Sequence, residues 1–280
     1  MERSFRDIST AEELIKYLSD SAERLKNSGY IYHYTTLPVL IKMIKSKKWH
    51  LANAKNMNDR LEYDNGDIER WKNIFFSSFM TEDKESIGMW SMYAQPWEKG
   101  IKIAIPSLIA RKWIKSIVKL YEVSMGNYET TGRTFEVAKE NIKLSSVAYC
   151  NTDSRTQKDI VEKLCWSNVT NTILLSAAHD LSLTGYIKDM AWAYEKEIRI
   201  RAEFDNTNGF ERVAIDLPDD VIDSMTITAS PLFEGMLLNE IEKEIERQLK
   251  IDNSLFAGRL NIKTICQSCD FRKMHRGGTV

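Results

Sequence analysis

The sequence predicts an α+β fold, in which short strands and amphipathic helices follow one another without regular alternation. Two kinds of segment indicate this fold: short apolar or alternating runs, typical of strands, and longer runs with apolar side chains at helical spacing. The chain has 280 residues, of which 43% are apolar and 28% charged, enough to bury a substantial core. We find no internal repeat, low-complexity tract or linker, so we expect one principal domain.

The first half of the chain contains the clearest elements. Residues 11–26 have apolar side chains at helical spacing and predict a helix capped by Ser9 or Thr10. Pro38 is typical of a helix start, and Pro106 of a strand end. The other elements expected here are strands at 31–34, 49–52, 74–79 and 100–105, helices at 37–45 and 108–120, and a segment at 86–94 that follows an acidic turn.

The second half is less regular. Residues 121–145 show no clear period, residues 151–178 look helical, and a strand is expected around the glutamates of 192–199. The remaining elements expected are strands at 210–215, 225–229 and 260–265 and a helix at 232–249. The simplest division is a helical N-terminal extension, residues 1–29, followed by one domain, residues 30–280.

Composition argues against several protein classes. A net charge of −1 is not that of a uniformly basic nucleic-acid binder, although local basic patches remain compatible with it. No run reaches the roughly 18 apolar residues that span a bilayer, and the charged start lacks a signal-peptide core, so we expect a cytoplasmic protein without membrane contact. Four cysteines at irregular spacing agree with a reducing compartment. Cys266 and Cys269 form a single CxxC without a second ligand pair, so no metal site is expected.

A histidine in a strand-like segment is the first candidate for chemistry. His33 stands between Tyr32 and Tyr34, with Thr35 next to them. A neutral imidazole can hold a sugar hydroxyl by hydrogen bonding. A histidine at a strand edge is also often just a polar group with a satisfied partner, and the residues alone leave both interpretations open.

Two glutamates late in the chain are the second candidate. If residues 192–199 form a strand, alternation places Glu195 and Glu197 on one face and Ile198 on the opposite, core-facing side. The carboxylate face is then either the wall of a cleft or plain solvent. In the solvent alternative, the carboxylates pair with neighbouring basic residues, namely Lys196, Arg199 and Arg201.

Together the two segments supply what cleavage of NAD between nicotinamide and ribose requires. That reaction builds positive charge on the sugar, as in other glycosidic cleavages through an oxocarbenium-like transition state. A nearby carboxylate stabilises this charge. A carboxylate that also accepts a hydrogen bond from a ribose hydroxyl orients the sugar and so favours the transition state over the ground state.

Several motifs recur in one order along the chain. They are His33-Tyr34-Thr35, Asn58-Asp59-Arg60-Leu61-Glu62, Phe76-Ser77, Met89-Trp90, Tyr93-Ala94, Gly100 and Tyr194 to Arg199. This order, over roughly residues 31–230, resembles a bacterial family catalogued as a domain of unknown function. That family is similar, more distantly, to ADP-ribosyltransferases of the diphtheria-toxin and poly(ADP-ribose) polymerase type. The resemblance implies an ADP-ribosyltransferase-like split β-sheet core with flanking helices, and makes residues 30–280 the catalytic domain.

The resemblance also implies roles for single residues, with NAD as co-substrate. His33 becomes the ribose ligand on the first strand, with Tyr34 and Thr35 beside it. Tyr93 becomes the residue that stacks on nicotinamide, delivered by a strand, a loop and a short helix. Glu197 becomes the catalytic carboxylate, because transferases with a Glu-x-Glu pair use the second glutamate for NAD and the first for the acceptor. Glu195 remains an alternative.

Two further residues border the expected NAD site. Ser77 belongs to the Phe-Ser motif on the predicted strand at 74–79. Arg60 lies in a polar loop with Asn58 and Asp59, where it can meet a pyrophosphate bidentately. Asx residues also form turns, so the same loop is equally well explained as a structural corner.

The acceptor of the ADP-ribose is the least determined part. Distantly similar bacterial transferases include toxins of toxin–antitoxin and phage-defence systems, so we expect a mono-ADP-ribosyltransferase toxin, with RNA or single-stranded DNA slightly favoured over protein and an antitoxin as possible partner. Basic clusters beside Trp90 or Trp97 would suit such an acceptor. They are Lys42, Lys45, Lys47 and Lys48; Arg111, Lys112, Lys115 and Lys119; and Arg272, Lys273 and Arg276. The alternatives are an NAD glycohydrolase and an inactive nucleic-acid or partner-binding module.

Overall fold

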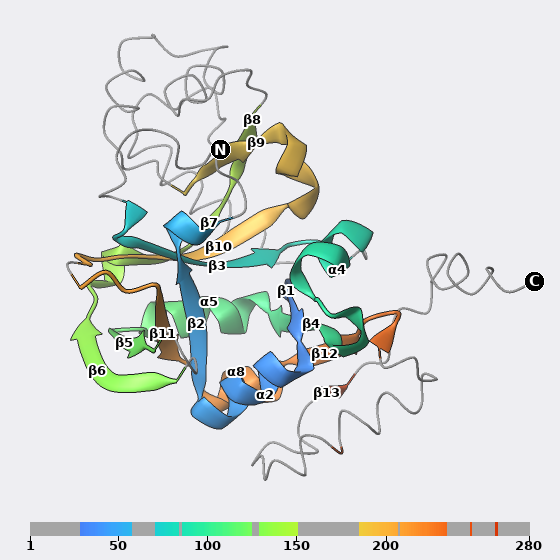
Figure 1. Cartoon of the computed structure of the whole chain (residues 1–280), viewed down its shortest axis with the longest axis horizontal. Coiled ribbons are helices and arrows are strands. Elements are labelled where there is room, and N and C mark those ends of the chain that lie inside the picture. Colours follow the sequence, from blue (N-terminus) through green and yellow to red (C-terminus); the bar gives the residue numbers. More distant parts are fainter. Residues whose placement is uncertain are drawn as a thin grey trace, which may run out of the picture. The chain divides into compact units, whose positions relative to one another are not determined.

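The computed structural model describes residues 29–57, 71–83, 86–124, 129–150, 185–206, 208–233, 247 and 261–262. These residues form a mixed α/β structure with a mostly antiparallel sheet and few helices (Figure 1), which confirms the predicted mixture of elements. They divide into two compact units. Unit 1 contains His50–Ser78 and Ile114–Ile215, and unit 2 contains 29–49, Phe79–Trp113 and the described residues from Asp216 on.

Unit 2 is built on an antiparallel pair. β1 (Tyr30–Thr36) pairs with β4 (Gly100–Pro106) along its whole length. β12 (Thr226–Ala229) pairs antiparallel with the other side of β4, and β13 (Asn261–Ile262) adds to β12 in parallel. The predicted strands at 31–34, 100–105 and 225–229 are confirmed, and the strand at 260–265 is present at its described residues.

Helices join and cover these strands. α2 (Leu37–Ser46) follows β1 directly, with Pro38 in its first turn, as predicted. It packs against β1, and its buried side chains are apolar residues at helical spacing. Burial of this apolar face stabilises the short helix. The other helices that lie wholly or mainly in unit 2 are α4 (Ile87–Tyr93), η5 (Trp97–Lys99), α5 (Ser107–Ser116) and α8 (Asp219–Ser224).

Unit 1 contains the greater number of strands, together with several short helices. They are β2 (Lys48–Asn53), η3 (Ala54–Asn56), β3 (Ile74–Met80), β5 (Lys119–Val123), β6 (Thr130–Glu136), η6 (Lys139–Asn141), β7 (Ile142–Ser146), β8 (Ala148–Cys150), β9 (Ile187–Asp189), η8 (Met190–Glu195), β10 (Glu197–Glu203) and β11 (Arg212–Asp216). β10 lies between β3 and β7, and β11 pairs with β5, which pairs with β6. β8 and β9 form a separate parallel pair. The chain passes between the units within β2, β3, α5 and β11.

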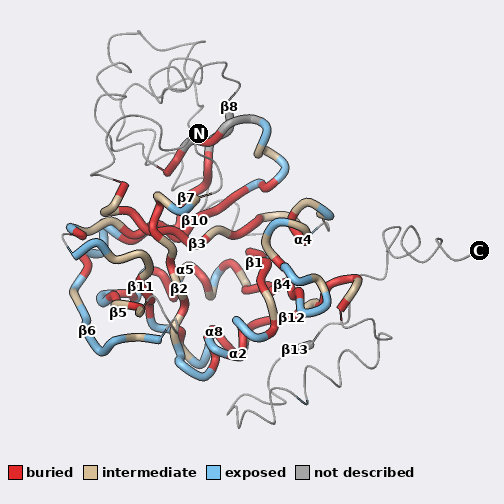
Figure 2. The backbone as a smooth tube through the Cα atoms, in the orientation of Figure 1, coloured by how far each residue is buried: buried red, intermediate tan, exposed pale blue. Residues whose placement is uncertain are grey.

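Burial differs sharply between the middle and the edge of the unit 1 sheet. β10, which has a neighbouring strand on each side, is buried from Glu197 to Ala202, whereas β6 is mostly exposed (Figure 2). A strand covered on both faces has to bury every side chain that it carries. The charged residues of β10 are therefore inside unit 1, and this determines the character of the candidate site.

The least regular part of the sequence contains elements that were not predicted. Residues 121–145 hold the end of β5, all of β6 and most of β7, and the helix expected at 108–120 ends at Ser116. β6 is polar and exposed on both faces, so it lacks the alternation that reveals a strand. The helices expected at 11–26 and 151–178 and most of the one at 232–249 lie outside the described residues, as does nearly all of the expected extension at 1–29.

Candidate active site

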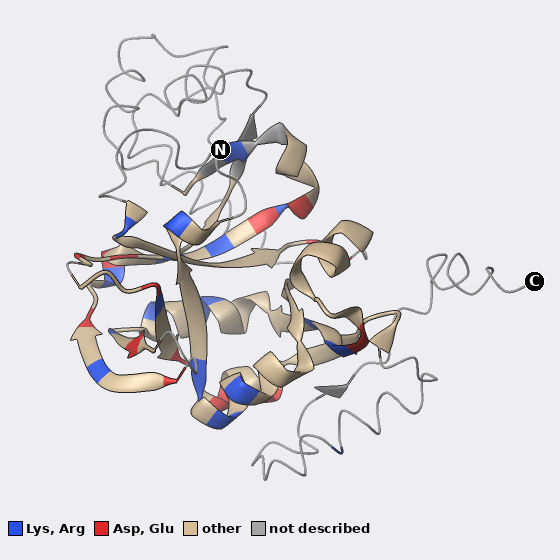
Figure 3. Cartoon of the chain, viewed as in Figure 1, with Lys and Arg blue, Asp and Glu red and all other residues tan. Residues whose placement is uncertain are grey.

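Four charged side chains of unit 1 form one buried group, which we call the charged array: Lys188, Glu195, Glu197 and Arg199. Each residue is at most 3% exposed. Arg199 binds Glu197 two residues earlier on β10 in a fork, with Nε 2.6 Å from Oε1 and Nη2 2.9 Å from Oε2. Figure 3 shows the charged residues along β10. A bidentate pair of this kind fixes the carboxylate in the plane of the guanidinium.

Lys188 connects the two carboxylates. It is the central residue of β9, and its Nζ lies 2.5 Å from Oε2 of Glu195 and 3.4 Å from Oε2 of Glu197. The same ammonium lies 4.5 Å from the centre of the Trp192 ring, close enough for a cation–π contact. One cation is thus shared by both glutamates that the sequence singles out.

Phe76 and Gly185 enclose the arginine end of the array. The Arg199 guanidinium carbon lies 4.8 Å from the centre of the Phe76 ring, and Nη1 donates to the Gly185 carbonyl at 3.0 Å. Gly185 has a φ of +82°, and a Cβ there would lie 2.0 Å from the Phe76 ring. Both the backbone conformation and the close approach of Phe76 therefore require glycine at this position.

The array keeps Glu197 ionised. Burial opposes the charged form of Glu197 and raises its pKa. The Arg199 guanidinium, the Lys188 ammonium and hydrogen bonds from Arg199 and Ser78 outweigh this effect and lower the pKa to about 2. Glu197 has four donor contacts, two from Arg199 and one each from Lys188 and Ser78. An ionised carboxylate offers about four lone-pair directions, so these donors occupy its ordinary capacity.

The predicted placement of the two glutamates on one strand face is wrong. Glu195 is the last residue of η8, Lys196 adopts a left-handed φ of 43°, and β10 begins only at Glu197. The solvent-exposed alternative is wrong as well, because both carboxylates are buried. The two side chains nevertheless meet, since the turn at Lys196 brings both to the Lys188 ammonium.

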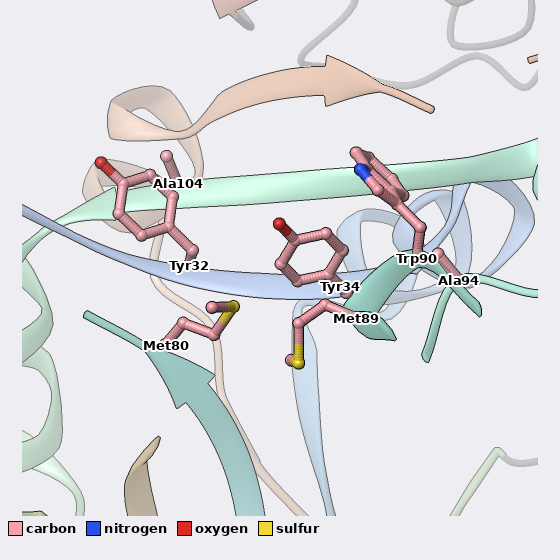
Figure 4. Packing of buried hydrophobic residues seen from close by; sticks show 7 residues of the cluster. All are labelled: Tyr32, Tyr34, Met80, Met89, Trp90, Ala94 and Ala104. Carbon is pink, nitrogen blue, oxygen red and sulfur yellow. The ribbon is translucent and has the colours of Figure 1, made fainter. Parts of the chain in front are cut away.

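The histidine motif lies in unit 2, where alternation along β1 separates its members. His33 contacts the rings of Trp49 and Phe79, with centroid distances of 5.0 Å and 5.3 Å. Tyr34 contacts Trp90 edge to face at 4.7 Å, in the cluster shown in Figure 4. Successive strand residues point to opposite faces, so Thr35 shares the His33 side of β1. Thr35 is itself buried.

Tyr93 packs against the cluster that contains Tyr34, on that side of β1. It packs against the aromatic cluster, which consists of Tyr32, Tyr34, Met80, Met89, Trp90, Ala94 and Ala104. Tyr93 is the last residue of α4, whose first turn is capped by Ser86, which accepts from the Met89 N–H at 3.4 Å. The predicted order of strand, loop and short helix before Tyr93 is confirmed.

Two residues that contact Glu197, Ser78 and Lys188, are not among the predicted site residues. Ser78, the neighbour of the predicted Ser77, hydrogen-bonds Glu197, and Ser77 is buried in the same strand. Lys188 lies in a three-residue strand, too short to show a period, so nothing in the local sequence marks it. Arg60 lies outside the described residues.

The first predicted basic cluster has acidic neighbours. Lys47 lies 2.9 Å from Asp219, and Lys48 lies 2.5 Å from Asp216, all in unit 2. These pairs reduce the positive charge that two of its lysines offer to an anionic partner. The predicted C-terminal cluster and the Cys266 and Cys269 pair lie outside the described residues.

Comparison with protein-family models, with curated proteins and with solved structures found no match for this chain. Among the described residues, no helix is long and apolar enough to cross a membrane. The function is therefore inferred from the motifs and the side-chain geometry of the chain itself.

Proposed function

We propose that the protein is an NAD-dependent mono-ADP-ribosyltransferase that acts as a toxin in a toxin–antitoxin or phage-defence system. The observation that carries this proposal is the buried, ionised carboxylate of Glu197, joined to a second carboxylate, Glu195, through Lys188. The order of sequence motifs supports the same activity. The mostly antiparallel α/β structure is compatible with a split-sheet transferase core.

The chemistry requires a carboxylate that stays charged while it is removed from water. Cleavage of the bond between nicotinamide and ribose leaves positive charge on the sugar, and a fixed negative charge in a region of low dielectric stabilises it more than one in water does. Glu197 meets this requirement because its pKa of about 2 keeps it ionised at neutral pH in spite of its burial. In this proposal Glu197 acts on NAD and Glu195 orients the acceptor.

The charged array also limits where the sugar can bind. Its two cations and two anions sum to zero, so a developing positive charge is stabilised only where it lies nearer to Glu197 than to Lys188 or Arg199. A ribose hydroxyl has to replace one of the donors to Glu197. The Lys188 contact, at 3.4 Å, is longer than the two Arg199 contacts and is the one we expect to yield.

The remaining roles follow the sequence motifs. His33, Tyr34, Thr35, Ser77, Arg60 and Tyr93 are the proposed NAD-binding residues. Of these, Tyr34 and Tyr93 gather in the aromatic cluster of unit 2, where Tyr93 offers a ring for stacking on nicotinamide. We place RNA or single-stranded DNA slightly ahead of protein as the acceptor, and a neutralising antitoxin as a partner.

The test is incubation of the purified protein with labelled NAD and separate pools of RNA, single-stranded DNA and bacterial lysate protein. The wild-type protein should transfer label to one pool, and Glu197→Gln should reduce the rate by several orders of magnitude while retaining much of the NAD affinity. Because the amide removes the negative charge that pairs with Arg199, Glu197→Asp is measured as well. It keeps the charge, moves it by one methylene, and should also lose most of the activity.

Glu203→Gln is the matched control, because Glu203 is also on β10 and is also paired with an arginine, Arg201, at 2.7 Å. It should retain the wild-type rate. Free ADP-ribose without labelled acceptor would identify an NAD glycohydrolase that uses the same carboxylate. Absence of NAD consumption with every pool would refute both enzymes and favour a binding module.

A further inference from the structure

Lys188 is a buried cation that no sequence motif includes, and the proposed chemistry involves it only as a contact that a ribose hydroxyl replaces. Its side chain is 2% exposed, and Nζ contacts two carboxylates and the face of Trp192. A lysine ammonium is costly to bury unless anions compensate it. The two glutamates compensate Lys188, and Lys188 in turn contacts both of them.

Strand pairing sets the backbone of Lys188, and its two carboxylate partners follow it closely in the chain. Lys188 is the middle residue of β9, paired in parallel with Tyr149 of β8. Glu195 ends η8 and Glu197 begins β10, on either side of the left-handed Lys196. The fork with Arg199 holds Glu197, and the Lys188 ammonium is a contact that Glu197 shares with Glu195.

We propose that Lys188 is the positioning residue of the site, which holds Glu195 and Glu197 in one array by sharing its ammonium between them. This inference rests on the proposed function. The contacts to the two carboxylates differ, 2.5 Å to Glu195 and 3.4 Å to Glu197. Lys188 therefore stays anchored on Glu195 when a ribose hydroxyl takes its place on Oε2 of Glu197. No bond to Lys188 forms or breaks in the reaction.

The test uses the full chain and three variants. Lys188→Met keeps the length of the side chain and removes the charge, Lys188→Arg keeps the charge, and Lys102→Met is the control. Lys102 is a buried lysine in unit 2, 4% exposed and 3.2 Å from a single carboxylate, that of Asp83. NAD cleavage is measured against NAD concentration and pH, and unfolding is measured against pH.

We expect Lys188→Met to lower kcat about 100-fold, with little change in KM, because the carboxylate is misplaced rather than lost. The acid limb of its pH profile should move to higher pH, since Glu197 loses a neighbouring cation. Lys188→Arg should restore part of kcat, and Lys102→Met should keep the wild-type pH profile. A folded Lys188→Met with the wild-type kcat and pH profile would overturn the proposal.

The unfolding measurement separates this inference from the proposed function. If Lys188 holds the array, the acid-induced loss of stability between about pH 4.5 and pH 2 should be smaller in Lys188→Met than in the wild type, whether or not NAD is cleaved. An unchanged acid dependence refutes the array role. If the wild-type protein does not cleave NAD, the proposed function is refuted, and so is a role for Lys188 in catalysis. The acid dependence of unfolding still decides whether Lys188 binds both carboxylates.

Discussion

The charged array of unit 1 and the aromatic cluster of unit 2 are both buried, but different interactions hold them. In the array, Glu197 and Arg199 are each no more than 3% exposed and are stabilised by opposite charge at 2.6–2.9 Å. In the cluster, Tyr34 and Trp90 contact each other edge to face, and Met89 packs beside them.

This difference determines how each region responds to change. The array is a set of coupled charges, so the removal of one leaves its partner buried without compensation. The cluster is a set of packed rings and side chains, so its stability follows the volume that a substitution removes. Protonation of Glu197 should therefore affect the array and leave the packing of Tyr34 against Trp90 unchanged.

The largest effect is expected for Arg199→Leu. It removes the fork on Glu197 and leaves a buried carboxylate with Lys188 as its remaining cation, so the free energy of unfolding at pH 7 should fall by about 3–5 kcal/mol. Urea denaturation measures it. The double variant Arg199→Leu/Glu197→Leu is the control and should recover much of the loss, since no charge is left uncompensated. A single variant that loses under about 1 kcal/mol would show that the fork contributes no more than a surface pair.

Acidification should give the next largest effect. The folded-state pKa of Glu197, about 2, lies below its ordinary value of 4.5, so its stabilisation is fully present above pH 4.5 and is lost as the pH falls toward 2. The shift corresponds to on the order of 3 kcal/mol. Unfolding of the wild type and of Glu197→Gln between pH 7 and pH 2 tests this, and parallel curves for the two proteins would contradict it.

The smallest effect is expected for Trp90→Phe in the aromatic cluster. The buried Trp90 Nε1–H has no hydrogen-bond partner among the described residues, so the change removes an unsatisfied donor while it opens a small space beside Tyr34. The two effects oppose each other, and the loss of stability should be no more than about 1 kcal/mol. It should also be the same at pH 7 and pH 4. A loss that grows on acidification would link the cluster to a titrating group.

The sequence predicted the elements whose side chains follow one clear period. β1 and β4 are apolar runs bounded by proline or glycine, and α2 combines Pro38 with apolar residues at helical spacing. β6 was missed because exposure on both faces removes the period, and helix was predicted past Ser116, where β5 follows α5 closely. Pattern alone does not distinguish such segments from loops.

The site was predicted only in part, for a similar reason. Glu195 and Glu197 were identified by their residue type and spacing, but their burial comes from the tertiary packing around the end of η8 and the start of β10, which no local pattern reveals. Lys188 and Ser78 reach Glu197 from other strands, so their role is a property of the tertiary structure. The left-handed turn at Lys196 broke the simple alternation on which the prediction rested.

Gly185 gives the charged array a recognisable sequence signature. Its carbonyl binds Arg199, and the Phe76 ring excludes any side chain there, so the glycine has a fixed place relative to the four charged residues. Written as a pattern, the array is G-x-x-K, six intervening residues, and then E-x-E-x-R, from Gly185 to Arg199. A related protein that keeps only E-x-E-x-R, without the glycine and the lysine, should lack the array even where its glutamates align. The complete pattern is therefore a more selective search query for proteins of the same chemistry than the glutamate pair alone.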